Sequence, residues 1–323
     1  MTIKFEKPGT GHLKGAVDLV TNAYSEERKA IDFLPAVDYS KIFSKRIKNL
    51  FLNGSGVVAI QAGKVVGFLG GYEIKELWGN CKGVYCPIYG HGALMRDRRK
   101  IYQNLYKQAA GLWVDKGITN HSITLYAQDQ EVIDTWFWLG FGLRCVDAIR
   151  ELDQINVEKS GINIKKVKLN DVASLVDIDK KHNSYYKESP IFMPVQEEDT
   201  ISKLTGWLSK ENHHMWMAYD NERVIGYMRI EPNGERFLTE HQDIMNITGA
   251  YVEETYRGQD IGSYLLDAIQ KWLKDNKYKL CGVDYESINI AGSKFWNKHF
   301  IPYTYSLVRR IDERSIKIRG SVN

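Results

Sequence analysis

The chain has 323 residues, of which 43% are hydrophobic and 26% charged, so it can bury folded cores and is not a disordered chain. At roughly 150 residues per domain, this length predicts about two domains. The 44 lysines and arginines nearly balance the 40 aspartates and glutamates, and a net charge of +4 gives no reason to expect a nucleic-acid or membrane partner.

Targeting and disulfide signals are weak. No stretch approaches the ~20 consecutive apolar residues of a membrane-spanning helix, and residues 1–14 have no apolar core, so we expect a soluble cytoplasmic protein. The four cysteines show neither CxxC spacing nor a disulfide framework, which predicts reduced and mostly buried thiols.

The sequence repeats itself once. Residues 63–68 resemble residues 222–227, and their glycines Gly67 and Gly226 are 226 − 67 = 159 positions apart. Residues 136–141 resemble residues 296–301 at a spacing of 296 − 136 = 160. Because these matches recur in the same order, we expect two homologous domains, residues 1–155 and 160–323, joined near residues 153–161.

Both halves predict the same alternation of strands and helices. In the second half the predicted elements are, in chain order, a strand at 162–167, a helix beginning in 172–179, a helix at 197–208, strands at 215–219, 223–230 and 244–252, a helix at 262–276, a strand at 280–285, a helix at 293–298 and a strand at 304–311. This order predicts a layered α/β fold with a mixed, partly antiparallel sheet.

A strand, a tight turn and a helix meet in residues 250–266, which read AYVEETYRGQDIGSYLL. A turn that precedes a helix directs several free backbone N–H groups at one point, and small residues there let a diphosphate approach. The glycine spacing matches neither GxGxxG nor the P-loop, which argues against hydride transfer and nucleotide hydrolysis. From the turn alone, a Gly258 that merely relieves a tight turn is an equally good interpretation.

The same residues resemble the signature of the GCN5-related N-acetyltransferase (GNAT) family, Arg/Gln-x-x-Gly-x-Gly/Ala at the start of the central helix. A second family element, a strand, an asparagine and an aromatic-rich helix, is matched by residues 283–289 and 295–300. The resemblance implies two tandem GNAT domains of α/β fold, with acetyl-CoA as cosubstrate and no metal ion. It assigns cofactor contacts to Val252, Arg257, Gly258, Gln259, Asp260, Ile261, Gly262, Ser263, Asn289 and Trp296.

The second half departs from the family pattern at two positions. Asp260 stands where the first glycine is usual, and its charge is unfavourable beside a diphosphate unless the side chain turns away to cap the helix. Trp296 stands where many members have the tyrosine that returns a proton to the coenzyme A thiolate. An indole N–H is not an acid at neutral pH.

The first half departs further. An alignment at a spacing of 160 residues puts Tyr102 opposite Gly262, directly after the basic run Arg98 to Lys100. A bulky residue at the start of the helix would remove the diphosphate site. We therefore expect a degenerate first domain that binds no cofactor.

Asp284 and Glu286 alternate on a predicted strand and so share one face, beside the expected acceptor site. Glu286 is the preferred base for the attacking amine, whereas the alternative is that one carboxylate caps the next turn and the other is solvated. The resemblance implies that a backbone N–H near Tyr251 or Val252 polarises the acetyl carbonyl, so Tyr251 joins the two carboxylates as a candidate catalytic residue.

These features predict an N-acetyltransferase, monomeric or homodimeric, that passes the acetyl group of acetyl-CoA to a primary amine of a small molecule by direct attack. The loops 181–194 and 231–243 are expected to form the acceptor site. His213 and His214 are adjacent, which on a strand sends them to opposite faces, and the better-spaced pair His241 and Asp243 has no third ligand nearby in sequence, so we expect no metal site. The two departures keep open an alternative, a non-catalytic acyl-CoA-binding or sensing protein of GNAT fold.

Overall fold

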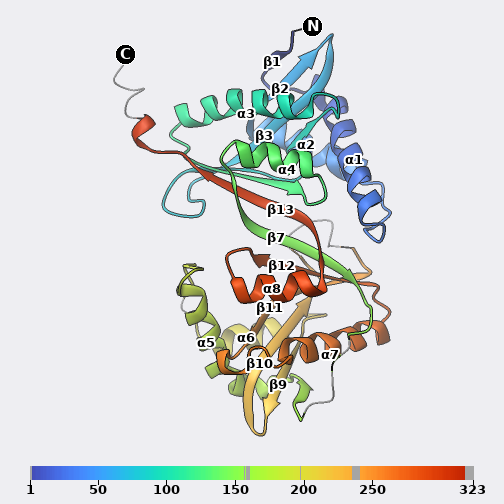
Figure 1. Ribbon diagram of the computed structural model, residues 1–323, viewed down its shortest axis with the longest axis vertical. Helices are drawn as coiled ribbons and strands as arrows, with labels where there is room; N and C mark the ends of the chain where they lie inside the picture. The colour runs from blue at the N-terminus through green and yellow to red at the C-terminus, as the bar shows by residue number, and fades with distance from the viewer. Residues whose placement is uncertain (1, 156, 158–160, 197, 235–240, 317–323) are drawn as a thin grey trace. The chain divides into compact units, whose positions relative to one another are not determined.

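The computed structural model describes residues 2–155, 157, 161–196, 198–234 and 241–316. The chain forms two compact units: unit 1 is Met1–Cys145 with Tyr303–Asn323, and unit 2 is Val146–Pro302. Each unit is a sheet covered by helices, which confirms the predicted α/β fold (Figure 1). Among the described helices, none combines the length and hydropathy needed to span a lipid bilayer.

The closing strands explain why these units differ from the predicted boundaries at residues 155 and 160. From Val146 onward, strand β7 (Gly142–Glu151) belongs to unit 2. From Tyr303 onward, strand β13 (Ile301–Arg310) belongs to unit 1, where it pairs with β6. Each unit is therefore completed by a strand segment from the other half of the sequence. Residues 156 and 158–160 of the predicted linker lie outside the described part.

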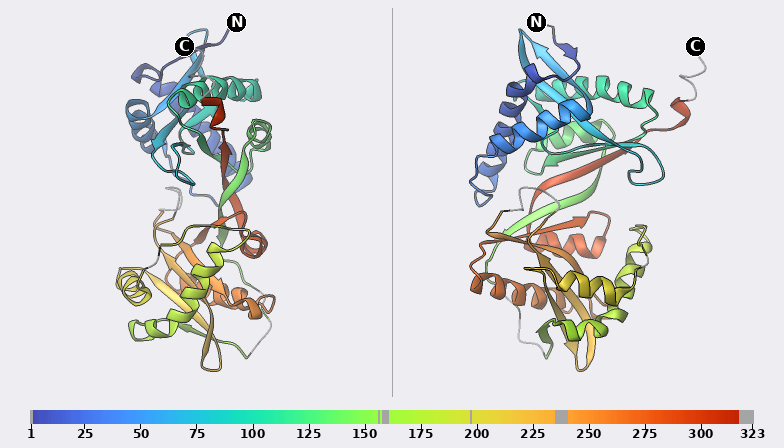
Figure 2. Two further views of the ribbon diagram at one scale, coloured as in Figure 1. Left: turned by 90° about the vertical axis from the view of Figure 1, so that its left-hand side faces the viewer. Right: turned by 180° about the vertical axis from the view of Figure 1, so that it is seen from behind.

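Unit 1 has a central sheet with helices on both faces. Its strands are, in sheet order, β1 (Lys4–Glu6), β2 (Ser55–Gln61), β3 (Lys64–Ile74), β4 (Gly83–Cys86), β6 (Asn120–Tyr126) and β13, with β5 (His91–Ala93) paired to β3. The 3-10 turn η1 (Thr10–His12) leads into α1 (Leu13–Ala30), which with α2 (Ser40–Asn53) packs on one face, whereas α3 (Arg98–Asp115) and α4 (Gln130–Trp138) pack on the other (Figure 2).

Unit 2 repeats this plan. Its strands are, in sheet order, β7, β12 (Leu280–Glu286), β11 (Ile244–Val252), β10 (Arg223–Glu231), β9 (His214–Asp220) and β8 (Asn163–Lys166). After the 3-10 turn η2 (Leu169–Leu175), α5 (Val176–Lys187) and α6 (Thr200–Leu208) cover one face. The other face carries α7 (Ile261–Asp275) and α8 (Ile290–His299), with the 3-10 turn η4 (Glu254–Tyr256) before α7.

Helix α7 owes its place to an apolar stripe. Leu265, Ile269 and Leu273 recur every four residues and are fully buried. Apolar residues at this spacing lie along one face of a helix, and burying that face on a sheet stabilises both elements. The packing fixes the N-terminus of α7 next to the ends of β11 and β12.

The sheet of unit 2 opens between β11 and β12. These parallel strands pair only from Ile244 and Leu280 to Ile247 and Val283. At Thr248 the register of β11 against β10 shifts by one residue, which is a β-bulge that turns the strand away. Beyond this point the two strands diverge, and no strand among the described residues pairs with the side of β11 that faces the gap.

Candidate functional site

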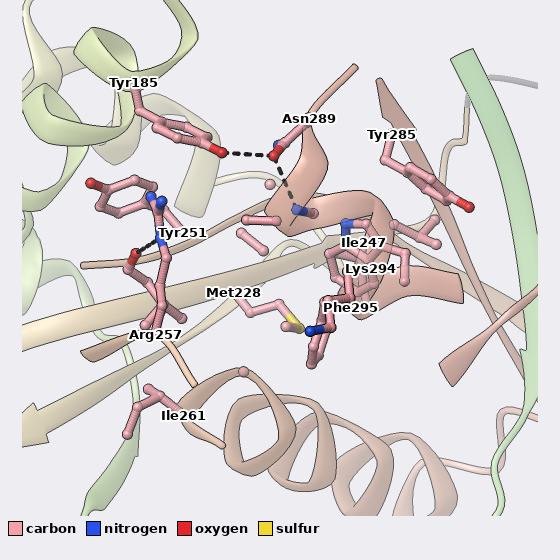
Figure 3. A pocket seen from close by; sticks show the side chains of 18 of the residues that line it. Tyr185, Met228, Ile247, Tyr251, Arg257, Ile261, Tyr285, Asn289, Lys294 and Phe295 are labelled. Carbon is pink, nitrogen blue, oxygen red and sulfur yellow. Dashed lines mark hydrogen bonds between the residues drawn. The ribbon is translucent and has the colours of Figure 1, made fainter. Parts of the chain in front are cut away.

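A pocket of about 580 Å³ occupies the gap between β11 and β12 (Figure 3). Its walls come from β10, β11, β12, the end of α5, the N-terminus of α7 and one face of α8. Every predicted site residue except Gln259 lines it. Gln259 is exposed, and its side-chain amide donates to the Thr255 carbonyl oxygen.

The turn before α7 is held by a buried ion pair. Glu253 is 5% exposed and pairs with Lys181 of α5 and, at 2.5 Å, with Arg223 of β10. Burial acts to raise the pKa of Glu253, but the hydrogen bonds from Lys181 and Arg223 outweigh it and lower that pKa. Because Glu253 is tied to both α5 and β10, these ion pairs hold the turn in one conformation.

Two residues with left-handed backbone turn the chain into α7. Gly258 has φ of 77° and Asp260 has φ of 58°. The first N–H groups of a helix have no acceptor within it, and they carry the positive end of the helix dipole. Ile261, Gly262 and Ser263, the first three residues of α7, all line the pocket, so their region suits an anion such as a diphosphate.

Asp260 does not cap α7. It occupies the N-cap position, yet its side chain makes no capping hydrogen bond, and the residue is exposed at the rim of the pocket. Of the two arrangements that the sequence left open for this carboxylate, the helix cap is excluded, because the left-handed backbone of Asp260 differs from the extended conformation of capping residues.

Gly262 leaves room between α7 and α8. A Cβ atom at this position would come within 3.0 Å of Cε2 of Phe295 on α8. Any side chain would therefore push into the gap between the two helices, which is part of the pocket. This observation supports the interpretation that small residues here admit a ligand.

Arg257 lies over two tyrosines at the edge of the cradle, as we call the turn at residues 257–260 together with the first three residues of α7. Its guanidinium carbon is 4.4 Å from the ring centroid of Tyr185 and 5.6 Å from that of Tyr251, and its Nε donates to the Val252 carbonyl oxygen at 3.2 Å (Figure 3). Cation–π contacts of this kind hold the arginine at the pocket wall.

Asn289 joins α5 to α8 across the pocket. Its Oδ1 accepts a hydrogen bond from the Gly292 N–H at 3.0 Å, which caps α8, and a second from the Tyr185 hydroxyl at 2.8 Å (Figure 3). Asn289 is therefore the N-cap of α8.

Asp284 and Glu286 face α5. Both line the pocket, and Tyr186 of α5 reports their proximity, since burial, Glu286 and Asp284 together raise the pKa of Tyr186 to about 12. Tyr285 lies between them, and its hydroxyl points away from Asn289 and donates to Asn297 Oδ1 at 2.7 Å (Figure 3). The predicted alternation along this strand is confirmed.

The backbone of β11 distinguishes the two predicted N–H donors. The Glu253 N–H donates to the Ile225 carbonyl oxygen of β10 at 2.9 Å. Successive residues of an antiparallel strand direct their N–H groups alternately toward and away from the partner. The Tyr251 N–H therefore faces β10, and the Val252 N–H faces the gap left by β12.

Residues 179–299 match the family model described as "Acetyltransferase (GNAT) family". This segment lies within unit 2 and contains the whole pocket wall. Unit 2 carries a GNAT acetyltransferase domain. A comparison with curated protein sequences finds no match.

Solved structures extend the likeness to the fold of nearly the whole chain. A GCN5-related N-acetyltransferase from Sphaerobacter thermophilus has a TM-score of 0.58 at 12% identity and covers 95% of both chains. A glucosamine N-acetyltransferase region of a fungal multi-domain GH3 β-N-acetylglucosaminidase has a TM-score of 0.53 at 15% identity, covering 95% of this chain and 38% of the other. At these identities the likeness shows the GNAT fold alone.

The GNAT domain has pocket residues that the sequence analysis missed. Lys294 and Lys298 line the pocket from α8, and Tyr185 and Tyr186 line it from α5. The lysines stand four residues apart on a predicted helix, a spacing that places both on one face and offered a signal. The tyrosines gave none, because the position of α5 over the gap depends on tertiary packing. Residues 235–240 of the second predicted acceptor loop lie outside the described part.

Unit 1 contains the same opening in a filled form. Strands β4 and β6 pair in parallel from Gly83 and Asn120 to Cys86 and Ile123 and then separate. His91 spans the place beyond, with Nδ1 at 3.0 Å from the Tyr102 hydroxyl and Nε2 at 2.7 Å from the Thr124 carbonyl oxygen. Burial lowers the pKa of His91 to about 4, so the ring is neutral at pH 7.

The structure corrects the predicted role of Tyr102. Helix α3 begins at Arg98, after Asp97, whose left-handed backbone (φ of 61°) matches that of Asp260 at a spacing of 260 − 97 = 163. Tyr102 is thus the fifth residue of its helix and does not stand at the helix start. Its side chain fills the gap from within, and Arg98 closes the end by pairing with Asp129, the N-cap of α4, at 2.7 and 2.8 Å.

Proposed function

We propose that the GNAT domain transfers the acetyl group of acetyl-CoA to a primary amine of a small molecule. One observation carries the proposal: a single pocket joins the anion-binding start of α7 to the carboxylates Asp284 and Glu286. Donor and acceptor ends of an acyl transfer are thereby held on two sides of one opening in the sheet.

The donor end suits a diphosphate and its attached chain. The first turn of α7 supplies N–H groups, and Arg257, Lys294 and Lys298 add positive charge to the same pocket. In this proposal the Val252 N–H, which faces the gap, polarises the acetyl carbonyl. Such a donor is fixed by the strand and needs no rearrangement during the reaction.

The acceptor end suits a protonated amine. Glu286 takes the proton of the incoming ammonium group, and the neutral amine then attacks the carbonyl carbon. Asp284 stabilises the approaching positive charge. Tyrosines from α5 and β10, together with Met193, wall this end with apolar surface.

The test is release of free thiol from acetyl-CoA in the presence of a panel of primary amines. We expect saturable turnover with at least one primary amine and none with tertiary amines of the same shape, which cannot give a stable amide. A thermal shift with coenzyme A and no turnover across the panel would instead support the acyl-CoA-binding or sensing protein, an alternative favoured by the exposed carboxylate of Asp260 beside the cradle.

A further inference from the structure

The thiolate that leaves coenzyme A must be protonated, and Trp296 cannot supply the proton. The tryptophan is 7% exposed and packs edge-on against Phe295 and Phe300, at ring-centroid distances of 4.8 and 5.5 Å. Its indole N–H is a hydrogen-bond donor without acidity at neutral pH. The acid must therefore be another group that reaches the gap between β11 and β12.

Three of the tyrosines around the pocket direct their hydroxyls elsewhere. Tyr227 hydrogen-bonds to His182 Nδ1 at 2.6 Å, Tyr256 donates to Asp220 Oδ2 at 2.7 Å, and Tyr285 donates to Asn297 Oδ1 at 2.7 Å. Each of these partners lies outside the residues that line the pocket. These hydroxyls are therefore poorly placed to reach a ligand in the gap.

Two further tyrosines are unfavourable for other reasons. Tyr186 faces Glu286 and Asp284, and a phenolate forming beside two carboxylates is repelled by them. Tyr251 packs its ring on that of His182, with centroids 5.2 Å apart and planes inclined by 28°. That stacking holds the Tyr251 ring against α5.

Tyr185 combines two features that these five residues have at most singly: Tyr186 also hydrogen-bonds to Asn289, and Tyr251 also lies under Arg257. Its hydroxyl reaches from α5 across to Asn289 Oδ1, and both residues line the pocket (Figure 3). The Arg257 guanidinium carbon lies 4.4 Å from the centroid of its ring, so a positive charge stands over the phenol as it loses its proton. Both features suit an acid.

We propose that Tyr185 is the catalytic residue that protonates the leaving thiolate, an inference that rests on the acyl transfer proposed above. The amine nitrogen forms the new C–N bond, and the C–S bond breaks with its electron pair on sulfur. The hydroxyl proton of Tyr185 goes to sulfur. Glu286, which has passed the ammonium proton to water, takes the surplus proton that the nitrogen carries after the attack. Exchange with water then returns Tyr185 to the phenol and Glu286 to the carboxylate.

The test compares Tyr185→Phe with a matched control, Tyr285→Phe, which removes a hydroxyl that points away from Asn289. We expect Tyr185→Phe to lower kcat by about 100-fold, the size typical of a lost general acid, whereas Tyr285→Phe keeps kcat within about twofold. An unchanged kcat in Tyr185→Phe, with an active parent, would overturn the inference.

A binding measurement tests the same contact without turnover. The parent should bind coenzyme A more tightly than its desulfo analogue, and Tyr185→Phe should reduce this preference by about fivefold, the worth of one hydrogen bond to sulfur. If the parent releases no thiol with any amine, the proposed function fails, yet this ratio still decides whether Tyr185 contacts the sulfur. An equal ratio in parent and variant would overturn the inference.

A third variant protects the test against misfolding. Replacing Tyr185 with a difluorotyrosine keeps the shape of the side chain and makes the phenol more acidic. If Tyr185 is the acid, the alkaline limb of the kcat–pH profile moves to lower pH. A profile that stays in place would count against Tyr185.

Discussion

Asp97 and Asp260 adopt the same left-handed conformation before α3 and α7, and neither caps its helix. A left-handed backbone strains any residue with a Cβ atom, and glycine relieves that strain. At position 260 the side chain also places a negative charge at the rim of the anion cradle.

We therefore predict that Asp260→Gly tightens coenzyme A binding without lowering the free energy of unfolding. The binding gain comes from the removed charge, and stability is retained because no cap is lost. Calorimetric titration and a melting curve measure the two effects. Asp97→Gly is the matched control, with the same backbone change and no effect on binding; weaker binding in Asp260→Gly would contradict the geometry of the cradle.

Glu286→Gln should lower kcat by about 100-fold or more while changing the coenzyme A dissociation constant less than about twofold. The substitution removes a proton acceptor and leaves every predicted phosphate contact intact. Steady-state kinetics with an active amine, paired with calorimetric titration of coenzyme A, give both numbers. Full turnover in the variant between pH 6 and 9 would assign the base to another group, and Asp284→Asn is then the next variant.

At the scale of elements, the contact between α7 and α8 controls access to the cradle. A Cβ at Gly262 meets the Phe295 ring at 3.0 Å, so Gly262→Ala displaces a ring that lines the pocket. We expect the coenzyme A dissociation constant to rise about tenfold or more, with a small change in the melting temperature, since one ring must shift by a few tenths of an ångström.

The number of coenzyme A molecules bound per chain tests whether unit 1 has a site of its own. The parent should bind one coenzyme A per chain, since His91, Tyr102 and Arg98 fill and close the corresponding gap in unit 1. Tyr102→Gly should still give one, because Arg98 keeps its ion pair with Asp129 and α3 keeps its additional first turn. Two equivalents bound by the parent would show that unit 1 holds a site of its own.

Local sequence signals predicted the elements well where periodicity and turn chemistry agree. The strand predicted at 244–252 is β11, and the helix predicted at 262–276 is α7 shifted by one residue. The cradle residues were predictable because a strand, a turn and a helix are contiguous in sequence. The placement of Tyr185, by contrast, depends on how α5 packs over the sheet, and no spacing within α5 encodes it.

The spacing of the repeat also failed at one point for a physical reason. An offset of 160 residues holds for β6 and β12 but becomes 163 at Asp97 and Asp260, because α3 begins one turn earlier than α7. Identity of residue type could not reveal this additional turn. The alignment consequently placed Tyr102 at the start of a helix in which it is the fifth residue.

On the scale of the molecule, a buried carboxyl group in unit 1 should make folding stability depend on pH. Glu27 is 3% exposed, and its Oε1 makes no hydrogen bond within the described residues. Burial raises its pKa from 4.5 to about 8, so the carboxyl is neutral in the folded unit at pH 7. Below pH 4.5 the carboxyl is protonated in both the folded and the unfolded chain, and the free energy of unfolding is highest. As pH rises from 4.5 to 8 only the unfolded chain ionises, so the free energy of unfolding falls.

Glu27→Gln should remove this dependence, because the amide keeps the shape and cannot ionise. We expect the variant to lose less stability than the parent between pH 5 and 8, measured by denaturant unfolding at several pH values. Glu26→Gln, an exposed neighbour on α1, is the matched control. Parallel pH profiles for the parent and Glu27→Gln would show that Glu27 is already ionised in the fold.

The exchanged closing strands set an order of events during synthesis. A ribosome releases the elements of unit 1 up to Cys145 long before it makes residues 303–310, which pair with β6 from Thr304 to Arg310 and bring Leu307, 5% exposed, into the core of unit 1. Nascent chains stalled before residue 303 should therefore keep β6 open to protease, whereas chains stalled after β13 has left the exit tunnel should be protected. Unit 1, most of which is synthesised first, therefore completes its sheet only after the last strand of the chain has been made.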